Sequence, residues 1–348
     1  MAPLLSGMTD NCTTLGLKAD AMASPSQISV FTNLGRMATT LGAFLRVTRG
    51  LFLLVGVPVM AQTSAPIHPA EPSVNLGQTS FLDALGGPGV LLEEIGGAYH
   101  SGKNMGSAGE TIDATNSVSS LAHVALLSKF RVLKAFYGVE LIGTAAHVNA
   151  GDGGTVGGWG DITVSPLILQ WKEQTLGNVR VDQRFVLDFD LPVGEYDRSS
   201  STSLSSHAFA VNPYYAVTLF PAKKIETSWR VHYLWNALNH APPTASMTRS
   251  TQAGQAIHFN ATTAFLCPGR LWVGANGYYL KQITAPQIGG VSLSDSPEQV
   301  ASIGPGAVWK AGNFHLYANG YHEFAAENRP EGNRLIFRVE WTSGRQQY

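Results

Sequence analysis

Apolar and polar residues alternate along most of the chain between residues 89 and 342. The final segment, 332–342, shows the pattern clearly. One set of alternate positions is apolar and holds Leu335, Phe337, Val339 and Trp341, and the other is mainly charged and holds Arg334, Ile336, Arg338 and Glu340. Successive side chains of a β-strand point to opposite faces, so this period predicts strands with one apolar and one polar face. A period of 3.6 is not sustained after residue 61, and we therefore expect an all-β fold.

Twelve segments carry this alternation, and most of them are long. Strands of globular proteins usually have about 5–6 residues, whereas a tilted strand that crosses a bilayer needs about 9–11. Segment length therefore favours a membrane barrel over a sandwich. The expected strands are 89–100, 118–130, 134–148, 159–172, 178–191, 206–220, 224–238, 254–267, 270–284, 299–310, 313–326 and 332–342.

The connections between these segments alternate in length. Those at 131–133, 172–177, 221–223, 268–269 and 311–312 are short. The longer and more polar ones are 101–117, 149–158, 192–205, 239–253 and 285–298. Outer-membrane barrels combine short periplasmic turns with long external loops. The sequence therefore predicts a transmembrane antiparallel β-barrel of about 12 strands, with its short turns in the periplasm and its long loops outside.

Composition agrees with a barrel. Only 14% of the residues are charged, against about 25% in soluble proteins, yet the mean hydropathy of +0.03 is too low for a bundle of membrane helices. A barrel resolves this conflict because about half of its strand positions face lipid and need no charge. The net charge of −1 provides no field that would attract nucleic acid. Two cysteines exclude a disulfide scaffold.

The first 61 residues are expected to be a leader. The apolar run 51–60 is too short to span a bilayer as a helix. Arg46 and Arg49 precede it and small residues follow it, which is the pattern of a secretory signal cleaved after Ala61. Met37 would give a start of ordinary length for such a signal.

The mature chain is expected to have three parts. Residues 62–85 form a periplasmic N-terminal segment or a plug, in which Ser80 can cap a short helix. Residues 86–342 form the barrel, and 343–348 form a C-terminal tail.

Aromatic residues near the expected strand ends suggest interfacial girdles, which are typical of outer-membrane barrels. They are Trp159, Trp171, Tyr214, Tyr215, Trp229, Trp235, Trp272, Tyr278, Tyr279, Trp309 and Trp341.

The polar faces of the expected strands carry charges of both signs. Facing the inside of a barrel, such side chains either form an ion-pair network that supports the wall or line a path for a solute. The residues expected to line the lumen are Arg180, Asp182, Arg184, Asp188, Asp190, Glu226, Arg230, His232, Asn236, Asn319, Glu323, Arg334, Arg338 and Glu340.

Signals for catalysis, cofactors and metals are weak. Ser205, Ser206 and His207 could supply a nucleophile and a base, but they lie at the edge of a loop without a flanking signature. His315 and His322 are seven positions apart, so they fall on opposite faces of a strand and make a poor metal pair. The glycines of 151–160 precede a strand rather than a helix, unlike a phosphate-binding loop. We therefore expect a non-enzymatic protein without a cofactor.

Four motifs resemble a known family. They are Gly160–Ile168 (GDITVSPLI), Asn276–Gln282 (NGYYLKQ), Ile303–Gly306 (IGPG) and Glu327–Gly332 (ENRPEG). Together they resemble the outer-membrane transporters linked to the meta-pathway of phenol degradation, over roughly residues 83–342. The resemblance implies a transmembrane β-barrel associated with the uptake of aromatic or other hydrophobic compounds, and it implies no catalytic residues.

The expected function is a channel for small hydrophobic or aromatic compounds in the outer membrane of a Gram-negative bacterium. Its expected partners are outer-membrane lipid, the solute and the barrel-assembly machinery, without nucleic acid. One alternative is a barrel that does not transport, such as an adhesin or structural protein that presents loops 192–205 and 239–253. Another is a secreted soluble β-sandwich.

Overall fold

The computed structural model describes residue 69 and residues 74–106, 109–111, 114–150, 154–200 and 202–343. These residues belong to one compact unit, Pro58–Tyr348. The leader at 1–61 with its cleavage site after Ala61, and residues 344–348 of the tail, lie outside the described residues.

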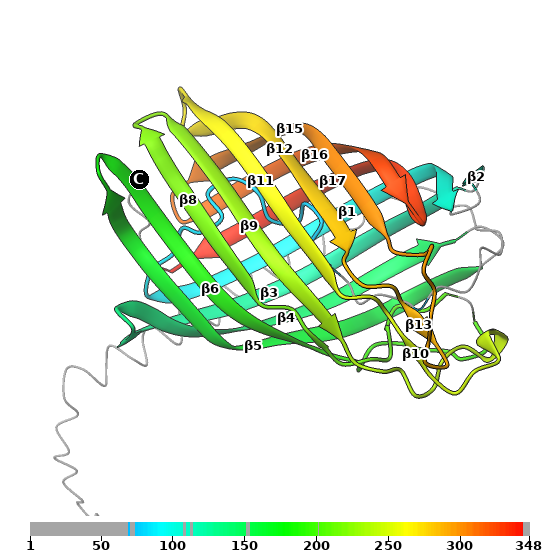
Figure 1. Ribbon diagram of the computed structural model, residues 1–348. Coiled ribbons are helices and arrows are strands. Elements are labelled where there is room, and N and C mark those ends of the chain that lie inside the picture. The colour runs from blue at the N-terminus through cyan, green and yellow to red at the C-terminus, as the bar shows by residue number, and fades with distance from the viewer. Residues whose placement is uncertain are drawn as a thin grey trace, which may run out of the picture. The chain divides into compact units, whose positions relative to one another are not determined.

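Twelve long antiparallel strands form a closed barrel (Figure 1). Each pairs with the next in the chain, and the last pairs with the first, so the ring has no free edge. The strands are β1 (Gly89–Gly106), β3 (Thr115–Val132), β4 (Ala135–Asn149), β5 (Thr155–Leu176), β6 (Val179–Leu191), β8 (Tyr214–Ala222), β9 (Ile225–Asn236), β11 (Ala256–Cys267), β12 (Leu271–Gln282), β15 (Gln299–Ala311), β16 (Phe314–Glu327) and β17 (Arg329–Thr342). The all-β barrel prediction is confirmed, and closure excludes the sandwich.

Short elements lie in or beside the longer connections. They are β2 (Gly109–Thr111), β7 (Ala210–Val211), β10 (Thr251–Gln252), β13 (Gln287–Ile288), β14 (Val291–Ser292) and the helical turn Thr244–Ser246. Strands β10, β13 and β14 form a separate three-stranded sheet.

Among the described residues, no helix is long and apolar enough to cross a membrane.

Several strand boundaries differ from the expected ones, and β5 (Thr155–Leu176), for example, extends beyond the expected 159–172 at both ends. Much of the expected loop 101–117 is strand, because β1 and β3 remain paired up to Ser101 and Thr115, and β1 continues along β17 as far as Met105. The expected strand 206–220 is divided into β7 (Ala210–Val211) and β8 (Tyr214–Ala222), with Asn212 and Pro213 between them. Proline cannot donate a hydrogen bond to a neighbouring strand, which accounts for the interruption.

The connections are sorted by length between the two ends of the barrel. We call one the short-turn end, where brief turns join β3–β4, β5–β6, β8–β9, β11–β12 and β15–β16. The opposite, long-loop end has the connections that follow β4, β6, β9 and β12. One connection there departs from the expectation, since Asn328 alone joins β16 to β17 with a φ of 55°. Left-handed backbone of this kind suits asparagine better than most residues.

Exposure alternates along the strands as the sequence predicts. In β9, Val231 and Tyr233 are 39% and 41% exposed, while Arg230 and His232 are 7% and 3% exposed. The apolar set therefore faces outward, where a membrane barrel contacts lipid. The prediction that His315 and His322 lie on opposite faces is also confirmed, because His315 is buried and His322 is exposed.

The girdle interpretation is wrong for three of its aromatic residues. Tyr214, Trp272 and Tyr278 are only 2–3% exposed and point into the barrel. Trp159 is 69% exposed, and the remaining members are exposed or half-buried. Sequence position near a strand end did not reveal which face these three rings occupy.

A stretch of chain before β1 lies inside the barrel (Figure 1). We call residues 74–88 the inner segment. It contains turns rather than the expected short helix at 80–85. The Ser80 hydroxyl, expected to cap that helix, instead accepts a hydrogen bond from Asn319 Nδ2 of β16 at 3.0 Å. Contacts with the barrel wall thus decide the conformation of this segment.

An arginine on the outward face of β9 should weaken the barrel. We expect Val231→Arg to lower the free energy of unfolding in lipid by about 2–4 kcal/mol, because a cation near the middle of a strand would face hydrocarbon. Urea titration in lipid vesicles measures the change, and Val231→Leu is the matched control. Equal stability of the two variants would contradict the assigned faces.

Candidate functional site

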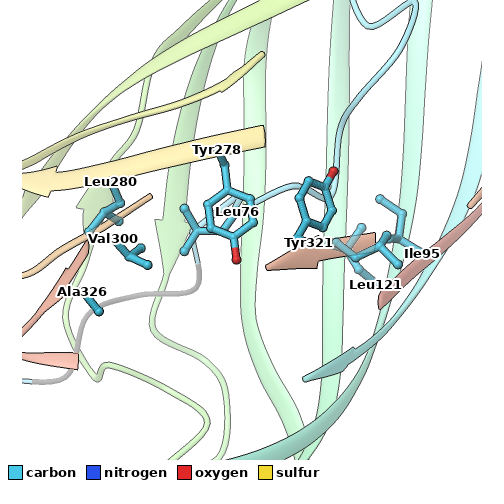
Figure 2. Close-up of a cluster of buried hydrophobic side chains, with 9 residues drawn as sticks. Leu76, Ile95, Leu121, Tyr278, Leu280, Val300, Tyr321 and Ala326 are labelled. Atoms are coloured by element: carbon cyan, nitrogen blue, oxygen red, sulfur yellow. The ribbon is translucent and has the colours of Figure 1, made fainter. Parts of the chain in front are cut away.

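Apolar side chains of the inner segment are packed against the barrel wall. Leu76 belongs to a cluster with Tyr278, Tyr321 and Leu280 of the wall (Figure 2). Further along, Phe81, Leu82 and Leu85 pack with Trp272, Tyr317, Val308 and Ala264. Phe81 and Ala84 have no exposed surface. Burying a large apolar side chain contributes about 1.5–3 kcal/mol, so this packing holds the segment firmly.

Wall side chains also satisfy the backbone of the inner segment. The N–H of Gly77 donates to Asn260 Oδ1 at 3.0 Å, and the N–H of Ala84 donates to Thr218 Oγ1 at 3.0 Å. The carbonyl of Ala84 accepts a hydrogen bond from Gln170 Nε2 at 2.8 Å. Buried backbone groups without partners are costly, so these side chains specify where the segment lies.

Two arginines of the wall hold the segment by charge-assisted bonds. Arg230 makes a bidentate contact with Asp83, with Nε–Oδ2 at 2.8 Å and Nη2–Oδ1 at 2.6 Å. Arg184 donates to the carbonyl of Leu85 at 2.8 Å and to Gln170 Oε1 at 2.7 Å. Both arginines are buried. Bidentate pairs of this kind are among the stronger and most directional hydrogen bonds in proteins.

Gly77 allows the segment to pass close to the wall. Its φ of 77° is in the left-handed region, and a Cβ built there would lie 2.6 Å from Cζ of Tyr321. The hydroxyl of Tyr321 in turn donates to the carbonyl of Gly77 at 2.8 Å. Only glycine combines this backbone angle with such a close approach.

The residues expected to line the lumen are on the inner face, and four of them contact the inner segment. Besides Arg184 and Arg230, these are Glu226, which accepts the N–H of Leu82 at 3.4 Å, and Asn319. They were expected to form a wall network or a solute path, and the structure gives them a third role as supports for the inner segment.

The other ten expected residues bond mainly within the wall. Arg180 pairs with Asp182 at 2.9 Å, and Arg338 lies 3.4 Å from the carboxylate of Glu93. Asp188 and Asp190 accept hydrogen bonds from Ser165 and Thr163. The remaining contacts are His232 with Asn212, Asn236 with the carbonyl of Gly254, Glu323 with Tyr99, Tyr278 and Arg334, and Glu340 with His315 and Tyr317.

Sequence reasoning missed a charged group on the neighbouring strands. His123 of β3 lies between Glu93 of β1, at 2.6 Å, and Glu140 of β4, at 3.0 Å. All three side chains are buried. Glu93 and Glu94 are adjacent within an apolar stretch, so the alternation that exposed other inward charges is obscured there. Asp83 was missed because it precedes the barrel.

Cavities lie on both sides of the inner segment. Two cavities of about 80 and 200 Å³ adjoin its start, where Gln78 contributes to the lining of both. A third, of about 780 Å³, lies at the short-turn end. Its lining includes Phe220 and Leu266, which pack against the cluster of Phe81, Leu82 and Leu85. The inner segment therefore separates the spaces at the two ends of the barrel.

The Ser205–His207 stretch makes the contacts of a loop. The Ser205 hydroxyl accepts the backbone N–H of His207 at 3.0 Å, and the Ser206 hydroxyl donates to Asp161 at 3.4 Å. The imidazole of His207 stacks on Tyr196, with 4.5 Å between ring centroids. Within the described part of the chain, no group of three His, Cys, Asp or Glu side chains could hold a metal ion.

Removal of Arg230 should destabilise the protein strongly. We expect Arg230→Met to lower the free energy of unfolding by about 3–5 kcal/mol, because Asp83 would remain buried as an unpaired carboxylate. Adding Asp83→Asn should recover part of this loss, which urea titration in detergent micelles would detect. The exposed Arg131→Met is the control, and strictly additive effects of the two inner substitutions would contradict the pairing.

Comparisons with known proteins agree with this architecture. A family model described as "MetA-pathway of phenol degradation" matches residues 96–339. The structure is similar to the COG4313 outer membrane channel from Pseudomonas putida F1, with a TM-score of 0.65, 14% identity and coverage of 78% of this chain and 100% of that chain.

Two further solved structures are more distant. The NanC porin has a TM-score of 0.39, 10% identity and coverage of 72% of this chain and 98% of that chain. The translocator domain of the autotransporter NalP from Neisseria meningitidis has a TM-score of 0.37, 10% identity and coverage of 74% and 89%. No curated protein matches the chain in sequence. The fold is that of the Pseudomonas channel, and the chain belongs to the MetA-pathway of phenol degradation family.

Proposed function

We propose that the protein is an outer-membrane channel for the uptake of small hydrophobic or aromatic compounds, and that the inner segment is its plug. The observation that carries the proposal is the non-covalent packing of residues 74–88 between the spaces at the two ends of the barrel. A solute that crosses the barrel must displace part of this segment. The family to which the chain belongs is described by the breakdown of phenol, which supports an aromatic solute.

The interior offers surfaces suited to an aromatic solute. Tyr214, Tyr278, Tyr317 and Tyr321 are at most 4% exposed and contribute ring faces to the inside of the barrel. Aromatic rings provide large apolar contact areas together with specific edge and face geometries. Several inward charges are paired within the wall, as in Arg180–Asp182 and Arg338–Glu93. A displaced plug would leave a mixed aromatic and polar path rather than a uniformly charged one.

The proposed setting is the outer membrane of a Gram-negative bacterium, reached after removal of a signal peptide and insertion by the barrel-assembly machinery. The exposed apolar side chains of the strands, such as Phe337 at 56% and Leu335 at 54%, suit contact with lipid. The charged side chains Arg334, Arg338 and Glu340 of β17 lie on the opposite, inward face. In this proposal the protein is a passive conduit and catalyses no reaction.

Locking the plug to the wall should abolish uptake. Ser80 and Asn319 are in hydrogen-bond contact at 3.0 Å, so Ser80→Cys with Asn319→Cys can be bridged by a short bis-thiosulfonate linker in a Cys267→Ser background. We expect intact cells with the bridged protein to take up labelled toluene no faster than cells that lack the protein. Removing the linker with dithiothreitol should restore uptake.

The single variant Ser80→Cys, treated in the same way, is the matched control and should remain active. Uptake that is unaffected by the bridge would contradict the assignment of residues 74–88 as a moving plug. If cells with the unmodified protein took up toluene no faster than cells that lack the protein, the channel proposal itself would be wrong.

A further inference from the structure

The cavity at the short-turn end is lined by cations and aromatic rings. Four of its lining side chains are basic, Arg180, Lys223, Arg270 and Lys310, and among its described lining residues there is no carboxylate. Two others are aromatic, Phe220 and Trp272. Their ring centroids are 6.3 Å apart in an edge-to-face arrangement. The cavity, of about 780 Å³, is large enough for a substituted benzene ring. We call it the basic vestibule.

Two of the four basic side chains of the basic vestibule have carboxylate neighbours outside its lining. Arg180 pairs with the buried Asp182 at 2.9 Å and lies 3.9 Å from Glu173, and its guanidinium lies 5.0 Å from the ring centroid of Phe220. Lys223 and Arg270 are exposed in the turns β8–β9 and β11–β12. Lys310 comes from the end of β15, and Glu340 is its charged neighbour. Since the exposed cations Lys223 and Arg270 come from two different turns and line one cavity, an anion placed there would be attracted from two sides.

The inner wall of the basic vestibule is apolar. Phe220 and Leu266 line the cavity and also pack against Phe81, Leu82 and Leu85 of the inner segment. Trp272, at 2% exposed, belongs to the same cluster. The cavity therefore presents an apolar and aromatic surface at its depth and cations toward its opening.

We propose that the basic vestibule is a binding site for small aromatic carboxylates. The ring would lie against Phe220 and Trp272, where its apolar surface is removed from water. The carboxylate would be held by the exposed cations Arg270 and Lys223, since ionised partners make the stronger hydrogen bonds. A neutral aromatic compound lacks the contacts with the cations, and a simple anion lacks the contacts with the aromatic rings. The site thus selects for the combination, and it goes beyond uptake of neutral hydrophobic compounds.

The test is a binding titration of the full chain in zwitterionic detergent, with benzoate as the probe and isothermal calorimetry as the readout. We expect saturable binding of benzoate, with benzyl alcohol and acetate each at least about tenfold weaker, because each lacks one class of contact. Equal binding of benzyl alcohol, equal binding of acetate or no saturable binding of benzoate would each overturn the proposal.

Variants in one turn provide a matched pair. Lys223→Gln removes a cation that lines the basic vestibule, whereas Lys224→Gln removes its exposed neighbour, which does not. We expect Lys223→Gln to weaken benzoate binding about tenfold, and Lys224→Gln to leave it unchanged. An equal loss of benzoate affinity in both variants would indicate an effect of general surface charge and would contradict the proposed site.

Phe220→Leu supplies an independent readout. It should weaken the binding of benzoate but not the weaker binding of acetate, and a parallel loss of both would contradict the role of the ring. Binding requires no passage through the barrel. Failure of this site and failure of the proposed channel are therefore distinguishable, because uptake of toluene can persist without benzoate binding and the converse also holds.

Discussion

The architecture depends on one constraint, which is that every backbone N–H and C=O within hydrocarbon must have a hydrogen-bond partner in the protein. The pairing of β17 with β1 meets this constraint by removing the sheet edges. Closure then divides the strand residues into two sets with different surroundings. The outward set contacts lipid and is apolar, while the inward set encloses a space that a ring of twelve strands does not fill with its own side chains. The inner segment occupies part of that space.

A chain segment inside the barrel also needs hydrogen-bond partners for its own backbone groups. The turns of residues 74–88 leave backbone groups that a helix or strand would satisfy internally. Asn260, Thr218, Gln170 and Arg184 supply the missing partners, and Asp83 brings a carboxylate to the buried Arg230. These contacts explain why some of the polar side chains of the wall point inward. Up to Gly89, where the segment continues into β1, it is held to the wall by non-covalent contacts, and this arrangement suits the plug proposed for it.

Much of the barrel was predictable from the sequence because period-two alternation reports which face a residue occupies. The residues at which β1 ends and β3 begins were not predictable, since the length of each strand depends on its partners in other strands. The turn at Phe81–Ala84 could not be foreseen either, because Ser80 is engaged by Asn319, which is 239 positions away. The site was predicted in part: Arg184, Glu226, Arg230 and Asn319 were identified as inward, but their partner was not. The group of Glu93, His123 and Glu140 was not recognised, because the adjacent Glu93 and Glu94 interrupt the alternation in β1.

The proposed plug, residues 74–88, occupies part of the barrel interior, and we expect it to move when a solute passes. Hydrogen–deuterium exchange followed by mass spectrometry tests it most directly, with the protein in lipid vesicles and with or without an aromatic solute. We expect faster exchange in the peptide that contains the N–H groups of Leu82 and Ala84 when solute is present, while β9 and β11 remain protected. Unchanged exchange of that peptide under conditions in which solute crosses the barrel would contradict the movement of the plug.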